Sequence, residues 1–230
     1  MQNRLELPEI LLIDKPLHMT SFDVIRVLRR KTGIKKFGHA GTLDPLASGL
    51  MILGVEKGTK RLTEFIKLDK EYVTEVRIGE SRTTDDLEGE ITEEVEVAEI
   101  FSDEKISATL AKLVGTTLLP VSAYSAIKKD GKPMYERARE AEVKGQQVLD
   151  VPVREMVVLE ARLLGHHATV LDEKKRHIIT VVFHVESGVY IRSLGKELGR
   201  LLGYPATLQL LRRTKIGTYS VENARTLESF

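Results

Sequence analysis

The spacing of apolar residues predicts strands over much of the chain. Tyr72, Thr74, Val76 and Ile78 occupy alternate positions, as expected for a strand with one buried face. Short apolar runs and stretches rich in β-branched residues predict further strands. These are Glu9–Ile13, Leu50–Val55, Val148–Leu164, Ala168–Leu171, His177–Val185 and an extended segment at Leu208–Val221.

Helices are indicated by apolar stripes of period about 3.6 and by residues that begin and end helices. One begins after Thr20, which forms a capping box with Asp23, and ends at Gly33. The other predicted helices are Thr59–Ile66, one capped by Ser102, one opened by Pro133, and one that starts beside Arg192 and ends at Gly203.

Strands therefore outnumber helices, and hairpin-like turns join many of them. This balance predicts an α+β fold with a mixed, largely antiparallel central sheet flanked by helices. The chain has 230 residues, of which 42% are hydrophobic, enough to bury a core. No segment has the composition of a linker, so we expect residues 1–230 to form one domain or two intimate subdomains.

Composition excludes several classes of protein. The chain has no cysteine, which rules out disulfides, thiolate chemistry and cysteine-based zinc sites. No apolar run reaches the ~18 residues that a membrane span needs, and Met1–Leu7 has no apolar signal core. We expect a soluble, cytoplasmic protein without a membrane partner.

The net charge of +1 conceals a segregation of charge along the chain. Residues 81–104 contain ten acidic residues and one basic residue, so this segment carries −9 and the remainder +10. Six basic clusters lie in that remainder, and a polyanion would be attracted to such a surface. Each cluster alone is better explained as a solvated surface, but together they favour a phosphate-rich partner.

The segment from Gly38 to Leu50 is the most informative in the chain. Three glycines and Pro45 surround the carboxylate of Asp44, and His39 lies five residues before it. Pro45 biases Asp44 toward an extended conformation, so the segment predicts a rigid loop that displays the carboxylate. An aspartate before proline is usually a turn residue. The alternative is a nucleophile or a general base.

Arg192 and Tyr72 are the next candidates. Arg192 follows a Ser-Gly turn at the start of a predicted helix, where the helix dipole does not favour a cation. It is explained by an anion that it holds, either a phosphate or a buried carboxylate such as Asp44; the alternative is a surface arginine without a fixed partner. Tyr72 is a core tyrosine or an aromatic that stacks on a nucleobase.

The sequence shows no signature of a metal site, a nucleotide-binding site or a catalytic triad. His166, His167, His177 and His184 do not have the spacing of metal ligands, so we predict no metal site. The chain contains no phosphate-binding loop, dinucleotide fingerprint or Ser-His-Asp signature. We therefore expect no cofactor.

Seven motifs taken together resemble the TruB-type tRNA pseudouridine synthases, in the order that the family shows. They are Asp14–Pro16 with Met19–Ser21, Gly38–Leu50, Lys70–Tyr72, Tyr124–Ala126 with Lys128 and Gly131, Tyr135 with Ala138 and Arg139, Gly188–Leu194, and Leu211–Arg213. The resemblance implies the pseudouridine synthase fold with a cleft at its centre, and an enzyme that isomerises uridine 55 in the tRNA T-loop.

The resemblance also implies roles for individual residues. Asp44 would be the nucleophile, Arg192 its ionic partner, and Tyr72 would stack on the extruded uracil and take part in proton transfer. His39 would fill the place that the base leaves. Tyr190 and Leu211 would line the uracil pocket, while Lys15, Lys128 and Arg212 would bind the RNA.

The expected partner is the T-arm of tRNA, with no obligate protein partner and a monomeric enzyme. The chain ends at Phe230, where bacterial relatives usually continue, so we expect the C-terminal PUA-like RNA-binding module to be absent. Two alternatives stay open. One is a non-catalytic RNA-binding or tRNA-folding protein, and the other is the catalytic subunit of a guide-RNA-directed pseudouridylation complex.

Overall fold

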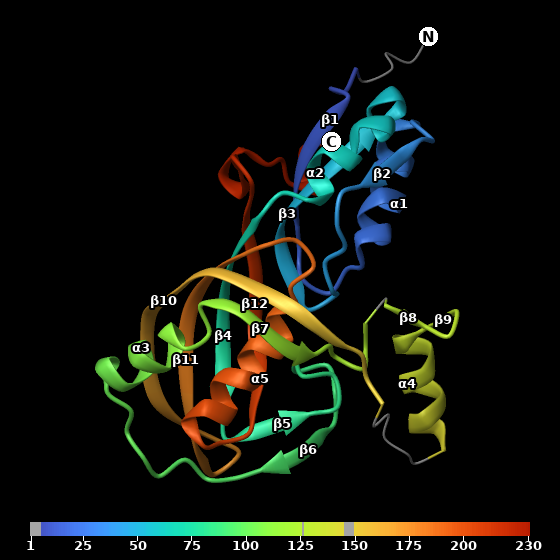
Figure 1. Cartoon of the computed structure of the whole chain (residues 1–230). Helices are drawn as coiled ribbons and strands as arrows, with labels where there is room; N and C mark the ends of the chain where they lie inside the picture. The colour runs from blue at the N-terminus through green and yellow to red at the C-terminus, as the bar shows by residue number, and fades with distance from the viewer. Residues whose placement is uncertain (1–5, 126, 145–149) are drawn as a thin grey trace. The chain divides into compact units, whose positions relative to one another are not determined.

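The computed structural model describes residues 6–125, 127–144 and 150–230 (Figure 1). The chain divides into two compact units. Unit 1 comprises Met1–Val73, His184–Ser187 and Leu210–Phe230, and unit 2 comprises Thr74–Phe183 and Gly188–Gln209. Three strands contribute residues to both units: β4 (Lys70–Ile78), β11 (Lys174–Val185) and β12 (Ala206–Ile216).

Unit 1 is built around β3 (Ala47–Val55). Two strands pair with β3 in antiparallel orientation, β1 (Ile10–Lys15) and β2 (Phe37–His39). The end of β12 pairs with β3 in parallel, with Leu211 opposite Ala47, and β13 (Tyr219–Ser220) pairs back on β12. The sheet is therefore mixed and mostly antiparallel here, as predicted.

Helix α1 (Ser21–Thr32) has the ends that the sequence predicts. The Thr20 side chain accepts a hydrogen bond from the Asp23 amide, the Asp23 carboxylate accepts one from the Thr20 amide, and the helix ends at Gly33 in the left-handed conformation. The predicted helix Thr59–Ile66 is wrong in extent. A 3-10 turn covers Glu56–Arg61, and only Thr63–Ile66 forms the short helix α2.

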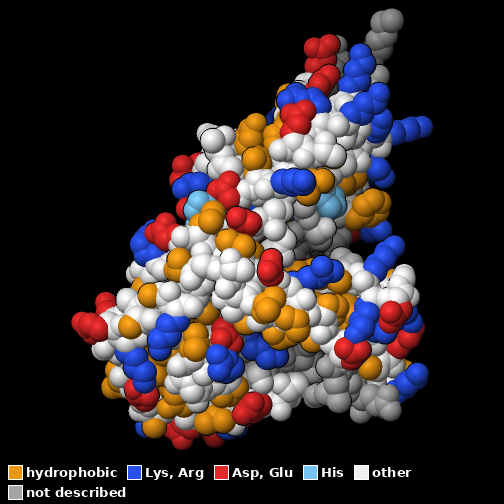
Figure 2. All heavy atoms as spheres, in the orientation of Figure 1, with side chains coloured by type: hydrophobic (Ala, Val, Ile, Leu, Met, Phe, Trp, Pro, Cys, Tyr) orange, Lys and Arg blue, Asp and Glu red, His pale blue; other side chains and the backbone are white. Residues whose placement is uncertain are grey.

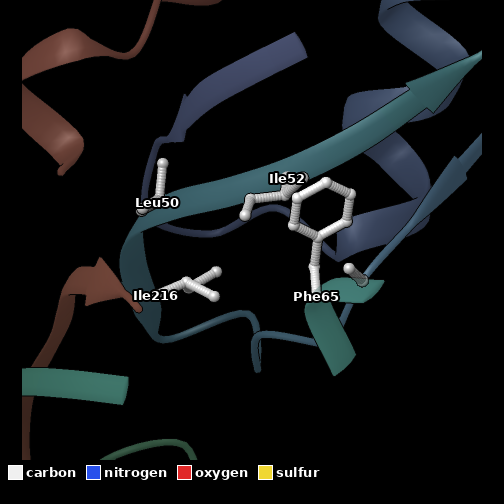
Figure 3. Close-up of a cluster of buried hydrophobic side chains, with 5 residues drawn as sticks. Leu50, Ile52, Phe65 and Ile216 are labelled. Carbon is white, nitrogen blue, oxygen red and sulfur yellow. The ribbon is translucent and has the colours of Figure 1, made fainter. Parts of the chain in front are cut away.

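A cluster of buried side chains forms the part of the unit 1 core that lies against β3. Leu50 and Ile52 of β3, Phe65 of α2 and Ile216 of β12 point toward one another (Figure 3). Ala40, which directly follows β2, completes the cluster and is 1% exposed. Burial of each large side chain contributes about 1.5–3 kcal/mol, and through Ala40 this cluster holds the start of the segment between β2 and β3.

Unit 2 contains the order β4-β11-β10-β7, in which β10 (Val153–Leu171) and β7 (Gly115–Pro120) are antiparallel. Its helices are α3 (Asp103–Ala111), α4 (Met134–Val143) and α5 (Ile191–Leu202). Its remaining strands are β5 (Glu80–Arg82), β6 (Ile91–Glu94), β8 (Lys128–Lys129) and β9 (Lys132–Pro133). The α+β class is confirmed.

Strand β10 corrects one prediction and β4 confirms another. The two strands expected at Val148–Leu164 and Ala168–Leu171 form one strand, because Gly165 continues the extended backbone; residues 148 and 149 lie outside the described part of the chain. Tyr72, Thr74, Val76 and Ile78 are all buried on one face of β4, as their alternation predicts.

The histidines of β10 and β11 form a hydrogen-bonded pair. The ring Nδ1 of His166 lies 2.7 Å from Nε2 of His177, and its Nε2 lies 2.7 Å from a carboxylate oxygen of Asp103. Because Asp103 accepts, His177 donates through Nε2, and its buried Nδ1 has no hydrogen-bond partner among the described residues. Within the described residues, no group of three or more His, Cys, Asp or Glu could hold a metal ion.

Burial, followed by the neighbouring His166 and His167, lowers the pKa of His177 to about 4. A histidine in the unfolded chain has its ordinary pKa of about 6.5, so between pH 6.5 and 4 the unfolded chain binds more protons. The contribution of the neutral, buried His177 to the stability of the fold is therefore fully present above about pH 6.5 and is lost as the pH falls toward 4.

We predict that His177→Gln reduces the pH dependence of the free energy of unfolding. In the wild type, this dependence amounts to about 2–3 kcal/mol between pH 7 and pH 4.5. Urea unfolding at pH 7, 5.5 and 4.5 measures it. The exposed His167, substituted by Gln, is the matched control and should keep most of the wild-type slope. Equal slopes for the wild type and His177→Gln would contradict the assignment.

A second prediction concerns the parallel pairing of β3 with β12. At Gly49 (φ +104°) an added Cβ would lie 2.2 Å from the Arg213 carbonyl oxygen, whereas at Gly33 (φ +72°) nothing lies within 4 Å of it. Both Ala substitutions incur a left-handed strain of about 1–2 kcal/mol, and Gly49→Ala adds a backbone clash. In urea unfolding, Gly49→Ala should cost at least about 3 kcal/mol, clearly more than Gly33→Ala. Equal losses would show that β12 does not approach β3 this closely.

No helix in the described part of the chain is long and apolar enough to cross a membrane.

Candidate functional site

Asp44 lies in the loop between β2 and β3 of unit 1, and its side chain is half-buried. The amide of Ala40 donates to the Ile52 carbonyl at 2.9 Å, which ties the start of the loop to β3. At the other end, the amide of Ala47 donates to the Asp44 carbonyl at 3.1 Å. The loop thus starts from a residue bonded to β3 and ends at the first residue of β3.

Ser21 holds the residue directly before Asp44. Its hydroxyl oxygen accepts from the Leu43 amide at 2.9 Å and donates to the Leu43 carbonyl at 3.2 Å. Ser21 is the first residue of α1 and is 3% exposed, so the capping box at Thr20 fixes where this hydroxyl points. The start of α1 therefore sets the backbone at Leu43.

Lys15 holds the residue directly after Asp44. Its ammonium donates to the carbonyl oxygens of Pro16 at 2.9 Å, Met19 at 2.6 Å and Pro45 at 3.4 Å. The predicted contact of Lys15 with RNA is corrected, because the side chain is 0% exposed. The alternation of β1 directs every second residue inward, and Lys15 falls on the inward series.

Arg213 supplies the third support of the loop. This arginine is 2% exposed, and it donates to the Leu50 carbonyl at 2.8 Å and to the Gly41 carbonyl at 3.3 Å. Sequence reasoning included Arg213 in the Leu211–Arg213 motif but gave it no role of its own. The backbone is consequently held at Gly41, Leu43 and Pro45, on both sides of Asp44.

His39 ends β2 and is half-buried. Burial lowers the pKa of His39, and the nearby charge of Arg213 lowers it further. Its Nδ1 is buried and makes no hydrogen bond within the described residues. The imidazole is therefore neutral at pH 7.

Leu211 and Arg212 lie on β12, beside the end of the Asp44 loop. Leu211 is 8% exposed and is paired with Ala47. Arg212 makes a bidentate ion pair with Asp14, at 2.7 and 3.0 Å, so its guanidinium is engaged within unit 1. Tyr72, on β4, is 9% exposed and belongs to the core face of that strand.

In unit 2, Arg192 occupies the first turn of α5 and is 5% exposed. Its guanidinium donates to the Thr84 carbonyl at 2.8 Å and to the Tyr124 carbonyl at 3.0 Å. The carboxylate of Asp86 lies 3.7 Å away. The alternative of a surface arginine is wrong, whereas its pairing with Asp44 stays a prediction.

Asp86 is a residue that sequence reasoning missed, because it was counted only among the ten acidic residues of 81–104. It is 3% exposed, and its carboxylate accepts from the Thr84 hydroxyl at 2.5 Å and from the Glu88 amide at 3.1 Å. A buried carboxylate needs such donors and a cation nearby, and Arg192 is that cation. The Thr-x-Asp spacing of this turn was the available signal.

The other predicted residues of unit 2 lie in different places. Tyr190 is the half-buried N-cap residue of α5, and Lys128 is exposed on β8. Ala126 of the Tyr124–Ala126 motif lies outside the described residues. A hollow of about 1080 Å³ lies within unit 2, between the β5-β6 hairpin, β7 and α5, and Tyr124 and Ser193 line it. The predicted central cleft stays a prediction.

Basic side chains gather on one part of unit 1. Figure 2 shows Lys and Arg side chains along the edge where Figure 1 draws α1 and β2. The last turn of α1 carries Arg29, Arg30 and Lys31. This surface is suited to a polyanion.

Comparison with known proteins gives consistent matches. A model of the TruB family pseudouridylate synthases (N-terminal domain) matches residues 29–191. The chain is 42% identical over 222 residues to the tRNA pseudouridine synthase B of Leifsonia xyli, covering 95% of this chain and 70% of that protein. It is 39% identical over 219 residues to the enzyme of the same name from Paenarthrobacter aurescens, covering 95% and 68%.

Among solved structures, the chain is similar to one in a Cbf5–Nop10–Gar1 complex, with a TM-score of 0.67 and 24% identity. The match covers 95% of this chain and 52% of that chain. A second match, in an H/ACA RNP bound to a substrate RNA containing 2'-deoxyuridine, has a TM-score of 0.64 and 22% identity. At this identity the likeness concerns the fold, which is the predicted pseudouridine synthase fold.

Proposed function

The chain belongs to the TruB family of pseudouridylate synthases, and on this premise we propose that it isomerises uridine 55 in the T-loop of tRNA to pseudouridine. The observation that carries the proposal is the loop of Asp44. A hydrogen bond from the Leu43 amide to Ser21, and hydrogen bonds from Lys15 and Arg213, hold its backbone on both sides of the carboxylate. A fixed backbone with one half-buried carboxylate is what a positioned nucleophile requires.

The reaction balances without an external reagent. The bond from C1′ of the ribose to N1 of uracil breaks, the base turns, and a bond from C1′ to C5 forms. The hydrogen of C5 leaves as a proton, and N1 takes up a proton. Asp44 acts as the nucleophile that allows the first bond to break.

Three other residues serve this step in our proposal. Tyr72 stacks on the uracil after the base leaves the RNA stack. Arg192 provides the positive charge that keeps the carboxylate of Asp44 ionised. The neutral ring of His39 fills the space that the base vacates. Such filling offsets part of the few kcal/mol that extrusion of a base costs.

The RNA partner follows from charge and from the relatives. The basic end of α1 supplies cations for the phosphates of a T-arm. The relatives from Leifsonia and Paenarthrobacter are named as tRNA enzymes, which favours tRNA over other RNAs. Binding through phosphates weakens as salt rises.

The test uses a T-arm stem-loop that carries tritium at C5 of the target uracil, with no guide RNA and no second protein. We predict label release by the wild type and a decrease of at least about a thousand-fold in Asp44→Asn, because the nucleophile is lost. The control is Asp172→Asn, an exposed turn residue at φ 50°, a conformation that asparagine tolerates.

No release by excess wild-type enzyme would refute the proposed function. Tight binding of the stem-loop without release would instead indicate an RNA-binding protein. Undiminished release by Asp44→Asn would exclude Asp44 as the nucleophile while leaving the activity intact.

A further inference from the structure

Ser122 makes a contact to Arg192 that neither the motifs nor the family comparison assigns. Its hydroxyl oxygen lies 3.1 Å from Nη1 of Arg192 and accepts a hydrogen bond from it. Ser122 is 1% exposed and lies just after β7, and Arg192 is 5% exposed. The contact is therefore a buried hydrogen bond to a charged group, which is of the stronger kind.

The orientation of this hydroxyl is fixed by a second bond. The Ser122 hydroxyl donates its one hydrogen to the Thr84 carbonyl at 3.2 Å, so its lone pairs remain for Arg192. The same Thr84 carbonyl accepts from Nη1 of Arg192 at 2.8 Å. Each of Ser122, Thr84 and Arg192 is thus hydrogen-bonded to the other two.

The kind of group that contacts the guanidinium distinguishes Ser122 from Thr84, Tyr124 and Asp86. The Thr84 and Tyr124 contacts to the guanidinium use backbone carbonyls, which any side chain at those positions would offer. Asp86 approaches only to 3.7 Å, a distance beyond hydrogen bonding. Ser122 therefore contributes a direct side-chain hydrogen bond to the placement of Nη1.

We propose that Ser122 is a positioning residue for Arg192 in the isomerisation, which rests on the proposed function. Its hydroxyl sets the rotation of the guanidinium, and with it the direction from which the arginine presents its charge to the reacting groups. Loss of this hydroxyl leaves the charge in place but widens the range of its orientations. Such a loss acts on the rate of the chemical step rather than on RNA affinity.

Ser193 offers a matched control in the same part of unit 2. It directly follows Arg192, is 5% exposed, and donates its hydroxyl to the Pro120 carbonyl at 2.8 Å. Ser193→Ala therefore removes a buried hydroxyl of the same size next to the same arginine without removing a bond to it. A general loss of packing or stability would affect both variants alike.

The experiment measures the single-turnover rate of tritium release and the Kd for the stem-loop in the wild type, Ser122→Ala, Ser122→Thr and Ser193→Ala. We expect Ser122→Ala to slow release about tenfold or more, in line with the loss of a hydrogen bond to a charged group. Its Kd should stay within about twofold of the wild type, since the phosphate contacts that dominate affinity are unchanged. Ser122→Thr, which restores the hydroxyl, should recover most of the rate, and Ser193→Ala should release label near the wild-type rate.

A Ser122→Ala rate within about twofold of the wild type would overturn the proposal, since loss of the bond should cost far more. So would an equal decrease in Ser193→Ala, a failure of Ser122→Thr to recover, or a change confined to Kd. If Ser122→Ala does not fold, Ser122→Cys, which keeps the size but accepts only weakly, replaces it with the same expectation. Absence of release by the wild type refutes the proposed function instead, so the two failures are distinguishable.

Discussion

The site depends on buried cations that hydrogen-bond to the backbone around Asp44. A buried ammonium or guanidinium is costly unless its donors are satisfied, and a loop carbonyl needs a donor when it leaves regular structure. Lys15 and Arg213 meet both needs at once, through the carbonyls of Pro45 and Gly41. The loop and the cations consequently stabilise each other, and the backbone at Asp44, between these carbonyls, is held in place.

Unit 2 applies the same principle to Arg192. Backbone carbonyls of Thr84 and Tyr124 satisfy the guanidinium, and the turn that contains Thr84 also buries Asp86. The arginine is thus held by its surroundings before any RNA arrives, which removes the cost of ordering it during the reaction. In each unit, a charged group of the proposed mechanism is set by hydrogen bonds to irregular backbone.

Local signals made the elements that carry the site predictable. The capping box at Thr20, the stop at Gly33 and the alternation of β4 depend on neighbours in sequence, and the structure confirms all three. The roles of Lys15 and Ser122 were not predictable, because they depend on contacts with Pro45 and with Arg192, which are far away in the chain. A lysine in a basic chain suggests a surface contact, and only the inward alternation of β1 reveals that it is buried. Asp86 was counted only among the acidic residues of 81–104, although the Thr-x-Asp spacing of its turn is a local signal.

The most direct test of this account compares Lys15→Met with the wild type, since methionine keeps much of the length of the side chain without its ammonium. Single-turnover pseudouridine formation and Kd for the T-arm stem-loop are measured on the same preparations. The account predicts a rate lower by about tenfold or more, because hydrogen bonds from a charged group to the Asp44 loop are lost, with Kd within about twofold of the wild type. A weaker affinity with an unchanged rate at saturating enzyme would show that Lys15 binds RNA, and would contradict the account.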